Sequence, residues 1–277
     1  MKVPGFYFIE KKLRNLRNKF FEKPTLPYLE MHIVEYCNLN CRRCGHYSNI
    51  GYKEYISVKD FKKTVKRLKK IFKTVTTFRI MGGEPLLHPD LLKILELSRH
   101  YLRKTNIRIA TNGLLLDKQK DNFWEKCRQL NIGIDMTIYP PLRNKEEPMH
   151  ALCNSKGVDL FTGYKVENFF AIRNRKGTSD PKKSIEICRK GSFCPIIKNG
   201  RLYVCAVAVY ISNYNKKFNQ TIPEGKGIDI YKHSGKELLQ FLFEPEETCR
   251  YCAYDYNTFK WDNSGDIHED DWDGKEI

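Results

Sequence analysis

The chain has 277 residues with 49 Lys or Arg against 33 Asp or Glu, a net charge of +16 at neutral pH. Its 41% hydrophobic and 13% aromatic content excludes a wholly disordered chain and allows one large domain plus a small one. It contains no run of about 18 apolar residues, and the N-terminal apolar stretch is interrupted by Pro4 and Gly5. We therefore expect a soluble, cytoplasmic protein whose ten cysteines are metal ligands or reactive thiols rather than disulfides.

Residues 1–27 are basic, and their apolar residues recur at helical spacing, which predicts an amphipathic helix packed on the rest of the protein. From residue 29 a repeating strand-then-helix pattern begins. Strands are predicted at 29–35, 77–81, 108–111 and 132–138, and helices at 57–74, 90–104 and 117–130. Such alternation predicts parallel strands joined by crossover helices, an α/β fold class.

Beyond residue 140 the pattern weakens, with a helix near 144–155 and short strands near 158–161 and 169–172, and the polar stretch 173–183 indicates a domain boundary. After it we expect a small cysteine-rich domain with a hairpin over 196–207 that turns at Asn199-Gly200. The last 25 residues hold eight acidic residues against two lysines, with aromatic residues between them, and are expected to dock on the protein. The predicted parts are 1–27, 28–180, 181–252 and 253–277.

Three cysteines follow the first predicted strand directly. Cys37, Cys41 and Cys44 have the spacing C-x3-C-x2-C, which lets one loop place three thiolates around a cluster of iron. Three ligands leave one iron of a four-iron cluster open for chemistry. A structural zinc site is the alternative, with His46 as its fourth ligand.

Two further motifs follow the next two predicted strands. Met81-Gly82-Gly83-Glu84-Pro85 comes after the second strand, and Thr111-Asn112-Gly113 comes after the third. The carboxyl ends of parallel strands form the functional face of an α/β barrel or sheet. Paired glycines let the backbone approach a ligand closely, and Glu84 offers a carboxylate to an ammonium group.

With these three motifs in order, residues 29–172 resemble the radical S-adenosylmethionine (SAM) superfamily. The resemblance implies a partial (β/α)6 TIM-like barrel and a [4Fe-4S] cluster held by the three cysteines. SAM chelates the open iron and is cleaved to a 5′-deoxyadenosyl radical, which abstracts hydrogen from the substrate.

The same resemblance assigns roles in SAM binding. Glu84 and the Gly82-Gly83 backbone would bind the amino group of SAM, and Thr111 and Asn112 would lie near its ribose or methionine part. Arg43 stands where the family often has an aromatic residue that contacts adenine. We expect His46 or Tyr47 to make that contact instead.

A second set of four cysteines lies in the C-terminal part: Cys188, Cys205, Cys249 and Cys252. Its spacing suits zinc and a fully ligated iron–sulfur cluster equally well. The layout resembles the Twitch form of the SPASM domain, in particular that of 2-deoxy-scyllo-inosamine dehydrogenase, which oxidises a secondary alcohol. This resemblance implies one auxiliary [4Fe-4S] cluster that accepts the electron of the substrate radical.

Three cysteines remain outside these two sets. Cys194 is the alternative to Cys188 as a ligand of the auxiliary cluster. Cys127 and Cys153 have no partner at ligand spacing and are expected to be buried structural thiols.

The sequence therefore predicts a radical SAM oxidoreductase that dehydrogenates or epimerises a sugar, cyclitol or nucleotide sugar, with flavodoxin or ferredoxin as electron donor. A peptide-modifying maturase is the alternative within this class, and a non-catalytic zinc or iron–sulfur protein that binds nucleic acid is the alternative outside it. Arg143, Arg173 and Arg175 are candidates to bind an anionic substrate. The candidates for the general base are Asp135, Tyr139 and His46.

Overall fold

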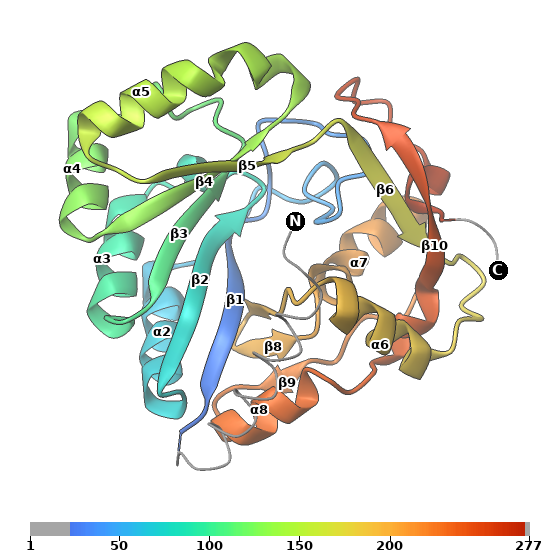
Figure 1. The fold of residues 1–277 in the computed structure, drawn as a ribbon. Helices are drawn as coiled ribbons and strands as arrows, with labels where there is room; N and C mark the ends of the chain where they lie inside the picture. The colour runs from blue at the N-terminus through green and yellow to red at the C-terminus, as the bar shows by residue number, and fades with distance from the viewer. Residues whose placement is uncertain (1–22, 275–277) are drawn as a thin grey trace.

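The computed structural model describes residues 23–274, so the apolar positions of the predicted N-terminal helix lie outside the described residues. An eight-stranded sheet in the order β5-β4-β3-β2-β1-β7-β8-β9 forms the body of the protein (Figure 1). Its first five strands are β1 (Thr25–Val34), β2 (Thr74–Gly82), β3 (Asn106–Thr111), β4 (Ile132–Ile138) and β5 (Leu160–Lys165). Each pairs with its neighbour in parallel, which confirms the predicted α/β class with a parallel sheet.

Four crossover helices cover the outer face of these strands: α2 (Val58–Ile71), α3 (Leu91–Tyr101), α4 (Asp121–Gln129) and α5 (Glu146–Lys156) (Figure 1). In α2 the spacing of Phe61, Val65 and Leu68 puts all three on one buried face, and the Ser57 side chain accepts the Asp60 N–H as an N-cap. Within residues 23–274, no helix is both long and apolar enough to cross a membrane.

The C-terminal hairpin extends the same sheet. Strands β7 (Ile196–Lys198) and β8 (Arg201–Tyr203) turn at Asn199-Gly200 as predicted, and β9 (Ile228–Asp229) pairs with β8. Strand β7 lies parallel to β1, with Glu30 opposite Ile196, so the two predicted domains share one sheet. The predicted hairpin is too long at its end, because Ala206 already begins a helix.

The C-terminal part also contains helices α6 (Pro181–Gly191), α7 (Ala206–Phe218) and α8 (Gly235–Phe241) and the short 3-10 helices η3 (Glu247–Tyr251) and η4 (Glu269–Trp272). Two further 3-10 helices, η1 (Pro85–Leu87) and η2 (Pro140–Lys145), follow β2 and β4. Strand β6 (Asn168–Arg173) pairs antiparallel with β10 (Cys252–Lys260) in a separate sheet (Figure 1). The docking predicted for the acidic tail is confirmed, because Trp272 is 4% exposed and stacks on Tyr47 at 5.1 Å between ring centroids.

A charged network crosses the inner face of the parallel strands. Asp135 on β4 accepts hydrogen bonds from Arg79 Nε on β2 and from Arg108 Nε on β3, both at 2.7 Å. Arg79 also donates to the Tyr28 hydroxyl on β1 at 3.3 Å. Because Asp135 is only 8% exposed, its charge depends on these two guanidinium groups.

Removing the Asp135 carboxylate should leave the partly buried Arg79 without its counter-ion and the buried Arg108 with Asp159 alone. Asp135→Ala should lower the free energy of unfolding by about 3–5 kcal/mol, measured by urea denaturation. Asp121, whose side chain is 91% exposed where it pairs with Lys156, supplies the matched Asp121→Ala control, which should cost much less. Equal losses in the two variants would contradict the network's role.

Candidate functional site

The three cysteines of the C-x3-C-x2-C motif lie in the loop that leaves β1, and N–H groups point at their sulfurs. The Leu39 N–H donates to Cys37 Sγ at 3.4 Å, and the Trp261 indole donates to Cys41 Sγ at 3.2 Å. Backbone N–H groups of residues 46–49 surround the buried Cys44 thiol. Burial raises the pKa of Cys37 to about 12 and that of Cys41 to about 11, so ligation of a cation must displace their protons.

The paired glycines bring β2 against the entry to this loop. The Gly83 N–H donates to the Val34 carbonyl at 2.9 Å. A Cβ atom on Gly83 would lie 2.0 Å from the Tyr36 carbonyl oxygen, and one on Gly82 would lie 2.1 Å from the Val34 carbonyl oxygen. Gly82 also has φ +149°, a conformation that side chains disfavour. The backbone of the glycine motif therefore packs directly on the residues that precede Cys37.

Glu84 joins this motif to the third one. Its carboxylate accepts from the Thr111 hydroxyl at 2.8 Å, from the Asn112 N–H at 2.9 Å and from the Leu86 N–H at 3.0 Å. Burial raises its pKa to about 7. The Glu84 side chain is fully buried and does not line the cavity described below. The sequence led us to expect that Glu84 binds SAM, whereas in the structure its carboxylate joins the end of β2 to the end of β3.

Asn112 completes the connection between the motifs. Its amide donates to Asn38 Oδ1 at 2.7 Å and to Cys37 Sγ at 3.4 Å. The ends of β1, β2 and β3 are thus joined by side-chain and backbone hydrogen bonds, as expected of three motifs at one edge of a parallel sheet.

A cavity of about 300 Å³ lies at this edge. The predicted site residues that line it are Cys37, Cys41, Cys44, His46, Gly82, Gly83, Thr111, Asn112 and Tyr139. Its other walls include Glu30, Ser48, Asn49 and Arg79. A cavity of this size suits a small organic ligand.

The two residues predicted to contact adenine lie in different places. Tyr47 is absent from the cavity wall, because its ring is 2% exposed and packs between Trp272 and Tyr214. His46 does line the cavity, but its Nδ1 lies 2.9 Å from His32 Nε2. Burial lowers the pKa of His46 to about 3, which keeps its imidazole neutral.

The candidates for the general base differ in whether they line the cavity. Asp135 does not line the cavity, and its carboxylate is held by two arginines, so the structure gives it a structural contact at this position. Tyr139 lines the cavity, and burial raises its pKa well above the ordinary value.

The three arginines expected to bind an anion face acidic partners instead. Arg143 pairs with Glu167 at 3.0 Å, and Arg173 and Arg175 both pair with Asp273, at 2.6 and 2.7 Å. None of the three lines the cavity. The acidic tail, which carries Asp273, therefore neutralises Arg173 and Arg175, and Glu167 neutralises Arg143.

Glu30 is a cavity residue that the sequence analysis missed. It is 5% exposed, its Oε1 accepts the Tyr28 hydroxyl at 2.6 Å, and its Oε2 has no hydrogen-bond partner among the described residues. Burial raises its pKa to about 7. The available signal was a glutamate in the middle of an otherwise apolar strand, where an acidic side chain is rarely buried without a role.

The second group of cysteines gathers around the C-terminal hairpin: Cys188 in α6, Cys194 before β7, Cys205 before α7, Cys249 in η3 and Cys252 at the start of β10. Burial raises the pKa of Cys252 to about 12, and the charges of Cys249 and Cys188 add to the shift. Burial also raises the pKa of Cys205, and the charges of Cys194, Cys252 and Cys188 add to this shift. Both Cys188 and Cys194 therefore lie within electrostatic reach of the other thiols.

Two further observations concern the cysteines. Within residues 23–274, no three His, Cys, Asp or Glu side chains converge on the position of a single metal ion. Cys127 and Cys153 are both fully buried, as predicted for structural thiols.

Comparison with known proteins identifies the part of the chain that carries most of the residues lining this cavity. Residues 31–146 match the Radical SAM superfamily model, and this part of the chain is a domain of that superfamily. Two curated relatives are GTP 3',8-cyclase of Trichodesmium erythraeum, 32% identical over 40% of this chain and 35% of its own, and GTP 3',8-cyclase 1 of Mycobacterium tuberculosis, 35% identical over 50% and 42%. The chain thus spans less than half the length of these relatives.

Among solved structures, the chain is similar to BtrN in complex with AdoMet and 2-DOIA, with a TM-score of 0.48, 16% identity, and coverage of 83% of this chain and 94% of that one. It is also similar to native anSMEcpe with bound AdoMet, with a TM-score of 0.41, 20% identity, and coverage of 50% and 43%.

The contact between Gly83 and the entry to the cysteine loop can be tested by adding one methyl group. Gly83→Ala should displace the backbone at Tyr36 and Cys37 and lower the free energy of unfolding by at least about 2 kcal/mol. Gly45→Ala is the matched control in the same loop, because a Cβ there meets no atom within 4 Å. Similar stability of the two variants in thermal denaturation would show that the close approach is unimportant.

The burial of Glu30 predicts a pH-dependent stability difference. Its folded pKa of about 7 lies above the ordinary 4.5, so its ionisation destabilises the fold increasingly as the pH rises from about 4.5 through 7. Glu30→Gln cannot ionise, and between pH 5 and pH 8 it should gain up to about 3 kcal/mol relative to wild type. Exposed Glu125→Gln should show no such gain, and a pH-independent difference for Glu30→Gln would contradict the argument.

Proposed function

We propose that the chain is a radical SAM oxidoreductase that abstracts hydrogen from a small polar molecule, with a sugar, cyclitol or related alcohol as the substrate class. The observation that carries this proposal is the cavity of about 300 Å³ at which Cys37, Cys41 and Cys44 meet the glycine motif within the radical SAM domain.

The residues present fit a [4Fe-4S] cluster. Three thiols border one cavity, and N–H groups from backbone, amide and indole point at their sulfurs, as expected around anionic cluster ligands. When bound with SAM, such a cluster supplies a 5′-deoxyadenosyl radical as the hydrogen-abstracting species. The protein would place SAM through the backbone of Gly82 and Gly83 and through Thr111 and Asn112, all of which border the cavity.

The charges in the cavity favour a neutral or amine-bearing substrate. Glu30 and Arg79 are the charged side chains other than thiols that line it, and Arg79 is already paired with Asp135. The relatives named as GTP 3',8-cyclases suggest a nucleotide, but no unpaired cation in the described cavity wall would meet a triphosphate.

Glu30 is our candidate for the group that receives the alcohol proton during oxidation. Glu30 lines the cavity, its Oε2 is buried without a hydrogen-bond partner among the described residues, and its other oxygen is fixed by the Tyr28 hydroxyl. Ser48 Oγ and both amide atoms of Asn49 are also buried without partners among the described residues. These groups can hydrogen-bond the hydroxyl or amino groups of a polyol.

We assign the second group of thiols to an auxiliary [4Fe-4S] cluster held by Cys205, Cys249 and Cys252 together with Cys188 or Cys194. Its role would be to accept the electron left on the substrate after hydrogen abstraction. A flavodoxin or ferredoxin would supply the electron that starts the reaction, and a cytoplasmic location is consistent with reduced thiols.

Iron content and SAM cleavage test the class of protein. Anaerobically reconstituted protein should bind about eight irons and, when reduced, release 5′-deoxyadenosine from SAM. Replacing Cys37, Cys41 and Cys44 with Ala should abolish the release. Replacing Cys249 and Cys252 should remove about four irons and preserve it.

Cys127→Ala is the matched control, because this buried thiol lies in the hydrophobic core and should leave both iron content and SAM cleavage unchanged. A colourless zinc protein without SAM cleavage would exclude the enzyme and favour the non-catalytic alternative.

A further inference from the structure

The residues from Phe259 to Gly274, here called the C-terminal clamp, lie across the loop that carries the first three cysteines. Within the clamp, Trp261 donates its indole N–H to Cys41 Sγ at 3.2 Å. Its ring lies against Tyr139 with 5.8 Å between centroids, and its backbone N–H donates to the Glu167 carbonyl at 2.9 Å. The indole is therefore held in place from two further sides.

Backbone contacts join the clamp to the same loop. The Arg42 N–H donates to the Asp262 carbonyl at 2.9 Å, and the Asn40 N–H donates to Asn263 Oδ1 at 2.6 Å. Farther along, the Trp272 indole donates to the Cys44 carbonyl at 2.9 Å. The clamp thus contacts the loop on both sides of Cys41.

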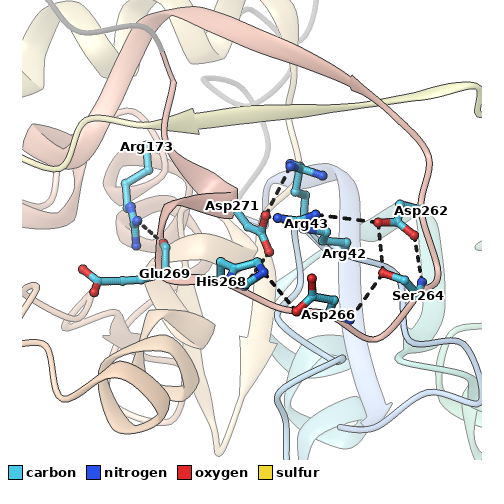
Figure 2. Close-up of polar contacts among 9 residues, drawn as sticks. All are labelled: Arg42, Arg43, Arg173, Asp262, Ser264, Asp266, His268, Glu269 and Asp271. Carbon is cyan, nitrogen blue, oxygen red and sulfur yellow. Dashed lines mark hydrogen bonds and ion pairs between the residues drawn. The ribbon is translucent and has the colours of Figure 1, made fainter.

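Buried charges complete the contact (Figure 2). Asp271, whose side chain is 1% exposed, accepts from Arg42 Nε at 2.6 Å and pairs with Arg43 at 3.2 Å. Its second oxygen accepts the His268 N–H at 2.9 Å. The Arg43 guanidinium lies 3.8 Å from the Phe259 ring centroid. Arg43 therefore points into the clamp, which explains why it replaces the aromatic residue expected at this position.

A hydrogen bond to a cysteine sulfur changes how readily an iron–sulfur cluster accepts an electron. Reduction adds negative charge to the cluster and its thiolates, and a donor N–H stabilises that charge more in the reduced form. The indole of Trp261 is such a donor at one sulfur of the triad, and it comes from a segment more than 200 residues away in the sequence.

We propose that the C-terminal clamp orders the cysteine loop and that Trp261 is a positioning residue that raises the reduction potential of the cluster held by Cys37, Cys41 and Cys44. The claim about the reduction potential rests on the proposed function, because it needs an iron–sulfur cluster at these cysteines. The ordering of the loop does not, and it can be tested in the metal-free chain.

The first test measures the midpoint reduction potential of the cluster at Cys37, Cys41 and Cys44. This cluster is recognised because its electron paramagnetic resonance signal changes when SAM is added. Trp261→Phe keeps an aromatic ring but removes the donor, and its midpoint should become more negative. Trp261→His, which restores an N–H, should recover part of the shift. Trp124→Phe is the matched control, because the indole of Trp124, on α4, donates to the Gln119 carbonyl and not to a cysteine sulfur. An unchanged midpoint in Trp261→Phe would overturn the role of the indole.

The second test needs no cluster. In metal-free full-length protein, Asp271→Asn should speed alkylation of Cys41 and Cys44 by iodoacetamide several-fold, measured by peptide mass spectrometry. Asp266→Asn is the control, because this carboxylate pairs only with His268, and both are exposed. Equal alkylation rates in Asp271→Asn and Asp266→Asn would overturn the proposal that the clamp orders the loop. This test remains valid even if Trp261→Phe fails to retain a cluster. If wild type itself bound no iron, the proposed function would fail while this second test still judged the clamp.

Discussion

The ends of β1 and β2 approach so closely that no side chain fits between them, and the site depends on this approach. At Gly83 a methyl group would meet the Tyr36 carbonyl and the Cys37 N–H, so only glycine lets the chain pass. The position of Cys37 is therefore fixed by a contact two residues after the end of β1. Because the parallel strands end at one edge, the same approach places the cysteine loop beside β3 and opens the cavity between them.

Two buried glutamates at this edge differ in how many hydrogen bonds the protein gives them, and therefore in whether they can still bind a ligand. Burial raises the pKa of both Glu84 and Glu30 to about 7. Glu84 receives three protein donors, which use its carboxylate to join β2 to β3. Among the described residues, the carboxylate of Glu30 receives only the Tyr28 hydroxyl, and its second oxygen is buried without a partner in a residue that lines the cavity. A buried polar atom left unpaired costs free energy, which a ligand with a hydroxyl or amino group can recover.

Local patterns predicted the strands, helices and motifs well, because they depend on residues near in sequence. The apolar spacing of α2 and its cap at Ser57 are both local. The pairing of β7 with β1 joins segments about 165 residues apart, and no periodicity encodes it. The role of Arg43 depends on Asp271 and Phe259, and the exclusion of Tyr47 from the cavity depends on Trp272. These outcomes follow from tertiary packing, which a single sequence does not reveal.

The pairing of β7 with β1 also brings one cysteine of the second group close to a residue that lines the cavity. Glu30 lies opposite Ile196, and its N–H donates to the Pro195 carbonyl at 2.9 Å, which brings the neighbouring Cys194 close enough for the two charges to interact. Strand β1 thus presents Glu30 between the cavity on one side and the second thiol group on the other. Under the proposed function, a substrate bound at Glu30 would therefore lie close to both groups of thiols.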